Sequence, residues 1–197
     1  MRFGAYLNSE WLRTASYVAA IMACALAGRR ELAATKAGVL RLWPRFWFVA
    51  AGVLSVLLLG RLTGIGSNAY EIGRAKAMAG GWYWSERRRL QGVAIVGLGV
   101  LSLLDILVVA HAMGDRRRRY LTPLVCLHGL AGFAAARIVS LHQIDTVLYR
   151  RPILGARIAS VIELTFTTGL VVLAPLLTRY FARDIESLGQ ELKSISV

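Results

Sequence analysis

The sequence predicts an all-α integral membrane protein, a bundle of five transmembrane helices. Hydrophobic residues make up 56% of the 197-residue chain, and its mean hydropathy is +0.54, whereas soluble domains are about 45–50% apolar. These residues are concentrated in long runs, and the 24 Lys and Arg residues lie mostly between the runs. Several runs reach the length of about 20 residues that a helix needs to cross a bilayer.

Four runs meet this requirement clearly, and they cover residues 43–62, 90–112, 120–142 and 153–178. None of them shows the strict alternation of a membrane strand. Because backbone groups in lipid must be hydrogen-bonded within the segment, we expect each run to be a helix.

A fifth segment, residues 14–28, is shorter and rich in alanine. It has three possible interpretations: a spanning helix, a signal peptide cleaved near Ala25-Leu26-Ala27, or a helix on the membrane surface. The region before it is long for a signal peptide and contains Glu10. We therefore prefer the spanning interpretation.

The rest of the chain connects or follows these helices, so residues 1–180 are expected to form one transmembrane domain. Residues 63–89 are the longest connection, and we expect a short helix there, on the outer face, that ends at Gly80-Gly81. Residues 181–197 are polar and predict a C-terminal tail with a frayed helix.

The net charge of +13 favours contact with anionic lipid, since the basic residues flank apolar runs. No nucleic-acid-binding motif is present, so nucleic acid is not an expected partner. Twelve Lys and Arg residues fall on the side of the Arg116–Arg119 loop and eleven on the other, or fourteen against nine if residues 14–28 do not span. This count predicts a cytoplasmic Arg116–Arg119 loop in a bacterial cytoplasmic (inner) membrane.

Cysteine and histidine usage argues against metals and cofactors. Cys24 and Cys126 lie in apolar runs without a CxxC motif, which disfavours a disulfide framework or a zinc site. A haem would need two histidines at equal depth, but His111, His128 and His142 are expected at three different depths. We therefore expect neither a cofactor nor a metal.

Ionisable residues inside the spans are costly in lipid and should find partners. Arg137 is expected about 8 Å from the outer end of its helix and Glu163 about 15 Å, at about 1.5 Å of rise per residue. A long arginine side chain can bridge that difference. An Arg137–Glu163 pair is predicted, either as a structural contact that holds two helices together or as a polar centre for substrate binding or proton transfer.

Asp105 and His128 are expected to form a second pair in the other half of the membrane. Each lies about 10–12 Å from the inner end of its helix, and the loop between these helices is short, which makes them antiparallel neighbours. A hydrogen bond is predicted, with a structural role or a role in proton relay.

Two polar stretches, residues 80–92 (GGWYWSERRRLQG) and 137–145 (RIVSLHQID), are expected at the same membrane face. They are either an aromatic–basic membrane anchor or a pocket for a phosphate or carboxylate headgroup. The expected ligand-binding residues are Trp82, Tyr83, Arg87, Arg88, Arg137 and Ser140.

The pattern of Gly81, Trp82, Tyr83, Arg87, Arg88 and Gln91 before one span, with Arg137, Ser140, His142 and Asp145 at the end of the next, resembles a group of uncharacterised bacterial multi-pass membrane proteins. The resemblance covers about 65 residues. It implies a membrane protein and no particular activity.

The preferred function is a non-enzymatic membrane component that binds anionic lipid, another membrane protein or a second copy of itself through this cluster. The first alternative is a membrane enzyme acting on a lipid-linked or phosphorylated substrate, with His142 as general acid/base and Asp145 orienting it. The second is a small proton-coupled carrier that uses Asp105, Glu163 and Arg137.

Overall fold

A computed structural model describes residues 10–36, 43–81, 83–114, 117–139, 152–153 and 156–195. Within these residues the chain forms six α-helices: α2 (Glu10–Lys36), α3 (Pro44–Leu62), α4 (Ile65–Ala79), α5 (Tyr83–Ala112), α6 (Arg117–Val139) and α8 (Ile158–Ile195). Two strands of two residues each, β1 (Pro152–Ile153) and β2 (Ala156–Arg157), pair antiparallel just before α8. The predicted all-α class is confirmed for this part of the chain.

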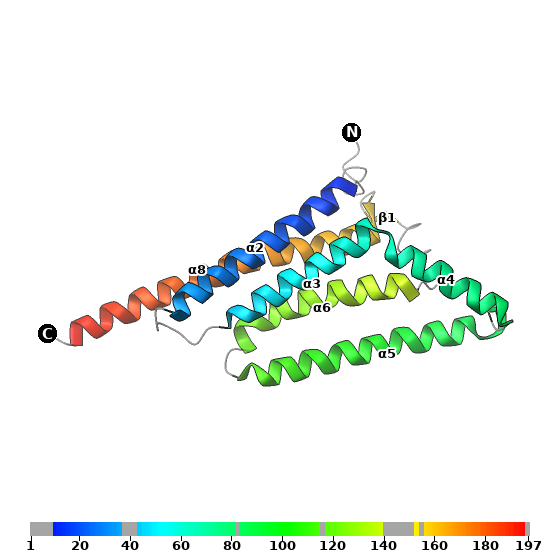
Figure 1. The fold of residues 1–197 in the computed structure, drawn as a ribbon. Coiled ribbons are helices and arrows are strands. Elements are labelled where there is room, and N and C mark those ends of the chain that lie inside the picture. Colours follow the sequence, from blue (N-terminus) through cyan, green and yellow to red (C-terminus); the bar gives the residue numbers. More distant parts are fainter. Residues whose placement is uncertain are drawn as a thin grey trace.

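The long helices alternate in direction, as Figure 1 shows. Helices α2, α5 and α8 run one way, and α3 and α6 run the other. The α4 end is our name for the end of the bundle where α4 lies, α2, α5 and α8 begin, and α3 and α6 finish. The opposite end, where α3 begins, is called the Trp43 end.

Four helical segments are long and apolar enough to cross a membrane: Glu10–Thr35, Pro44–Leu62, Gln91–Ala112 and Ile158–Arg179. They correspond to four of the five predicted spans. The remaining one, α6, has 23 residues but begins with three arginines and carries a histidine, which lowers its average hydropathy. The protein is therefore compatible with a membrane location, while a count of five spans stays a prediction.

Helix α2 is longer than the predicted segment 14–28 because residues on both sides continue the helix, so that it has 27 residues. One stripe of it, made of Tyr17, Ala20, Cys24 and Ala27, is buried, and α2 packs along α3 and α8. This helix supplies a large part of the core and contains a segment long and apolar enough to cross a membrane, and the spanning interpretation stays a prediction.

The core lies where α2, α3, α6 and α8 meet, and its largest fully buried apolar side chains include Trp47, Leu54, Leu130 and Leu170. Small residues such as Ala20 and Ala50 let neighbouring helices approach closely. This kind of packing stabilises helix contacts in lipid, where the hydrophobic effect between helices is absent.

Gly129 of α6 marks a close approach to α8, because a Cβ atom there would lie 2.5 Å from Cζ of Phe166. Gly129→Ala is therefore expected to cost about 1–3 kcal/mol of unfolding free energy through overpacking. Gly132→Ala is the matched control on the same helix, since its Cβ would meet no atom within 4 Å. It should gain up to about 1 kcal/mol from helix propensity. Unfolding in detergent micelles measures both, and equal effects would contradict the proposed close approach.

Three boundaries differ from or refine the sequence-based expectation. The short helix in residues 63–89 is present as α4, and it ends just before Gly80-Gly81, where Gly81 has a φ of +73°. Helix α8 begins at Ile158 rather than at residue 153, because the β1–β2 pair occupies the residues before it. It then continues without a break to Ile195, so the tail is helical beyond the predicted end at residue 178.

Helix α5 is the most separate part of the bundle. It packs along α6 and touches α4, and it runs along one side of the molecule in Figure 1. None of the residues in its most apolar window is buried. An apolar helix with so little protein cover is suited to contact with lipid.

Candidate functional site

The predicted aromatic–basic cluster is only partly within the described residues. Trp82 and residues 140–151, which include Ser140, His142 and Asp145, lie outside them. Tyr83, Arg87 and Arg88 belong to the first turns of α5, and Arg137 to the last turn of α6; their side chains also lie outside the described part. Their contacts therefore stay predictions.

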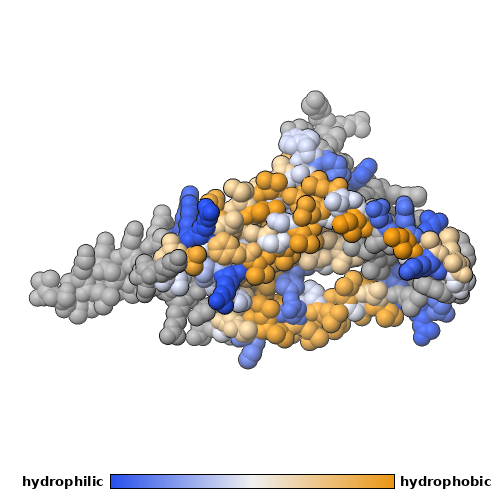
Figure 2. Space-filling model, viewed as in Figure 1, coloured by the Kyte–Doolittle hydropathy of each residue, from blue (hydrophilic) through white to orange (hydrophobic). Residues whose placement is uncertain are grey.

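The described backbone places the start of α5 and the end of α6 at the same end of the bundle. Helix α5 begins at Tyr83, α6 ends at Val139 and β1 begins at Pro152, all at the α4 end (Figure 1). Residues 140–151 connect two of these points. Exposed charged side chains at this end include Lys76, Glu86 and Arg89. In Figure 2 hydrophilic residues gather there, beside a hydrophobic middle section.

Asp105 and His128 form the predicted contact between α5 and α6. His128 Nε2 lies 2.5 Å from Asp105 Oδ2, and His128 Nδ1 lies 3.0 Å from the carbonyl oxygen of Leu124. The contact gives both polar side chains a partner, which lowers the cost of placing them in lipid.

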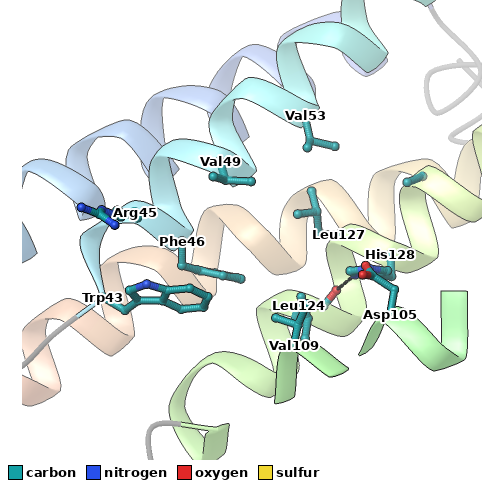
Figure 3. A pocket seen from close by; sticks show the side chains of 11 residues that line it. Trp43, Arg45, Phe46, Val49, Val53, Asp105, Val109, Leu124, Leu127 and His128 are labelled. Atoms are coloured by element: carbon teal, nitrogen blue, oxygen red, sulfur yellow. Dashed lines mark hydrogen bonds and ion pairs between the residues drawn. The ribbon is translucent and has the colours of Figure 1, made fainter. Parts of the chain in front are cut away.

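A cavity of about 350 Å³ lies beside this pair, between α3, α5 and α6. The walls are largely apolar, and the side chains of Phe46, Val49 and Val53 line one side while Leu124 and Leu127 line the other. In Figure 3, Arg45 and Trp43 lie at one end of the cavity, and Asp105 and His128 lie toward the other.

Glu163 lies in an ion network with partners other than the predicted one. Its Oε2 accepts a hydrogen bond of 2.7 Å from Arg61 Nη1, and Arg13 Nη1 lies 3.7 Å away. Glu10 bonds to both arginines, at 2.6 Å in the case of Arg61. Within the described residues these contacts pair two arginines with two glutamates and join α2, α3 and α8.

The later start of α8 explains this arrangement. Glu163 is five residues after Ile158, so it lies about 8 Å from the helix start rather than the expected depth of about 15 Å. At this shallower level Arg13 and Arg61 are within reach. The side chain of Arg137 lies outside the described residues, so its pairing with Glu163 stays a prediction.

A second buried carboxylate, Glu31, was not recognised in the sequence. It is 2% exposed. Trp47 Nε1 donates to its Oε1 and the Tyr120 hydroxyl donates to its Oε2, each at 2.8 Å. In the sequence Glu31 follows Arg29-Arg30 at the end of an apolar run, where it looks like an ordinary loop charge. The carboxylate ties α2 to α3 and α6 near the Trp43 end.

No protein-family model, no curated protein and no solved structure matches this chain. Its function must therefore be argued from its own side chains and their arrangement.

Proposed function

We propose that this protein is a non-enzymatic multi-pass membrane protein that binds anionic phospholipid headgroups at the α4 end. The observation that supports the proposal best is the gathering of three chain segments at that end: the start of α5, the end of α6 and the start of α8. The first turns of α5 carry Arg87, Arg88 and Arg89 against the single acidic residue Glu86. Phosphate is the natural partner of such an excess of guanidinium groups.

The internal ion network supports the same conclusion. Arg13 and Arg61 also lie at the α4 end, but both already form ion pairs with Glu10 and Glu163. The positive charge available to a headgroup is therefore that of the α4–α5 region, where Lys76 and Arg89 are exposed. By the Lys and Arg count, this end faces away from the cytoplasm and the Arg116–Arg119 connection faces the cytoplasm.

The polar groups described within the helices favour a structural role over catalysis or transport. Glu163 is held in a network of ion pairs that joins three helices, and Asp105 is paired with His128. The enzyme alternative depends on His142 and Asp145, which lie outside the described residues, so no observation favours it. A carrier would need Glu163 to change partners within a well-packed core.

Replacing Arg87 and Arg88 together with glutamine tests the proposal. Each Lys or Arg near an anionic surface contributes about 1 kcal/mol, so the dissociation constant for phosphatidylglycerol should rise roughly 30-fold. Native mass spectrometry of the purified protein with titrated phosphatidylglycerol measures it.

The matched control is the double replacement of Arg29 and Arg30 by glutamine. These two consecutive arginines are exposed near the end of α2, at the opposite end of the bundle. The control removes the same charge and should leave the α4-end affinity unchanged. Equal effects of both double variants would show that only net charge matters, and the proposed site would be wrong.

A further inference from the structure

The cavity between α3, α5 and α6 lies away from the α4-end cluster and has the shape of a slot that runs along the helices. On α3 its walls extend from Arg45 to Val53, and on α6 from Leu124 to Ala131. Eight residues of helix span about 12 Å. A slot of this length, parallel to membrane-spanning helices, has the orientation of an acyl chain in a bilayer.

The lining changes from residues typical of the headgroup layer at one end of the cavity to apolar residues deeper inside. Arg45 is exposed and lies in the first turn of α3, with Trp43 just before the helix. Arginine and tryptophan are the residues that favour the headgroup layer. Deeper in the slot, Phe46, Val49 and Leu127 offer apolar surface. Its volume of about 350 Å³ lies within the range of about 300–1,000 Å³ that is usual for small-molecule sites.

Asp105 and His128 are polar residues of the lining that contact each other. The side chain of Asp105 is 60% exposed, whereas that of His128 is 18% exposed. The contact with His128 gives the Asp105 carboxyl group a hydrogen-bonding partner, which lowers the cost of placing it beside a hydrocarbon chain. The pair also holds α5 against α6 and so keeps the third wall of the slot in place.

We infer that this cavity binds one acyl chain of an anionic phospholipid, whose phosphate lies at Arg45 at the Trp43 end of the bundle. The occupant is a lipid of the surrounding leaflet rather than a protein segment. Arg45 lies at the expected level of the headgroups, and the apolar walls extend from it along the helices toward the middle of the bundle. This site is independent of the proposed function, since it lies at the other end of the molecule.

Three variants test the inference in nanodiscs that contain phosphatidylcholine and phosphatidylglycerol, with the retained lipid counted by native mass spectrometry. Arg45→Gln removes the headgroup contact and should weaken retention of one phosphatidylglycerol about fivefold. Val49→Trp fills the slot and should abolish that retention. Val56→Trp is the matched control, because Val56 lies two turns further along α3, is 68% exposed and does not line the cavity.

Combination with the α4-end variant separates this site from the first one. Each change alone should weaken the binding of one phosphatidylglycerol, and adding Arg45→Gln to the Arg87/Arg88 double variant should weaken the binding of a second. If only the Arg87/Arg88 change has an effect, the inference fails while the proposed function stands. If only Arg45→Gln has an effect, the reverse is true.

Three outcomes would overturn the inference. The first is equal lipid retention by Val49→Trp and Val56→Trp, which would mean that no acyl chain occupies the slot. Equal retention of phosphatidylcholine and phosphatidylglycerol would show that Arg45 does not bind the headgroup of an anionic lipid. Loss of a dimer signal on Val49→Trp, without loss of lipid, would assign the cavity to a second copy of the chain. Arg45 is exposed, so its replacement should leave the fold intact and keep the test valid if Val49→Trp misfolds.

Discussion

Replacing Glu163 with glutamine is expected to destabilise the bundle by about 3 kcal/mol. Breaking a buried ion pair by removing one partner costs about 3–5 kcal/mol, because the remaining charge is left without compensation. The side chains of Arg13 and Glu163 are 5% and 4% exposed, and that of Arg61 is 13% exposed. The lower end of the range applies, since Glu10 still contacts both arginines.

Glu10→Gln is the matched control for this prediction. It removes the same charge from the same network, but the Glu10 side chain is 74% exposed. Exposed ion pairs contribute about 0–1 kcal/mol, so the control should have a small effect. Denaturant-induced unfolding of the protein in detergent micelles measures both variants. Equal losses of stability would show that burial of Glu163 does not matter and that the network is a surface feature.

His128→Ala has the second-largest expected effect, about 2–3 kcal/mol, because it leaves Asp105 without its partner within the membrane. An aspartate at mid-membrane costs about 2.5–3.5 kcal/mol on insertion scales. The consequence should be concentrated on α5, which packs mainly along α6. We expect a lower unfolding free energy together with weaker cross-linking between cysteines placed on α5 and α6.

Asp105→Leu is the informative comparison, since it breaks the same hydrogen bond but leaves a histidine. A histidine loses its charge at neutral pH far more readily than a carboxylate does. Asp105→Leu should therefore cost clearly less than His128→Ala, and the double variant with leucine at both positions should recover most of the loss. If the two single variants are equally destabilised, the charge of Asp105 is not the cause and a simple packing loss explains both.

The Asp105–His128 contact could be predicted from the sequence because the connection between the two helices is short. Counted from the predicted helix ends at residues 112 and 120, Asp105 and His128 lie about 10 Å and about 12 Å from this turn, which brings them to similar depths. The helix α6 itself begins three residues earlier, at Arg117. The prediction required only helical rise and an antiparallel arrangement. It did not require knowledge of how other helices pack.

The same reasoning did not predict the contacts of Glu163 with Arg13 and Arg61, because the start of its helix was placed five residues too early. An apolar run does not reveal that its first residues form a β1–β2 pair, and five residues correspond to about 8 Å of depth. Arg13 and Arg61 were counted only as flanking charges, since both lie at the edges of apolar runs. Their contact with Glu163 depends on which helices pack beside α8, and the sequence around Glu163 does not reveal those neighbours.

What the sequence determined by itself is the class of the protein. Long apolar runs separated by basic residues predict helices, because lipid offers no other hydrogen-bonding partner to the backbone, and four helical segments of the described chain are long and apolar enough to cross a membrane. Helical rise then sets the depth of each polar group along its own helix. Only the tertiary structure decided which groups meet: Glu163 with Arg61 and Arg13, and Glu31 with Trp47 and Tyr120. The cavity beside α5 also depends on it, because the rotation of each helix and the choice of its neighbours come from side-chain packing between segments far apart in the chain.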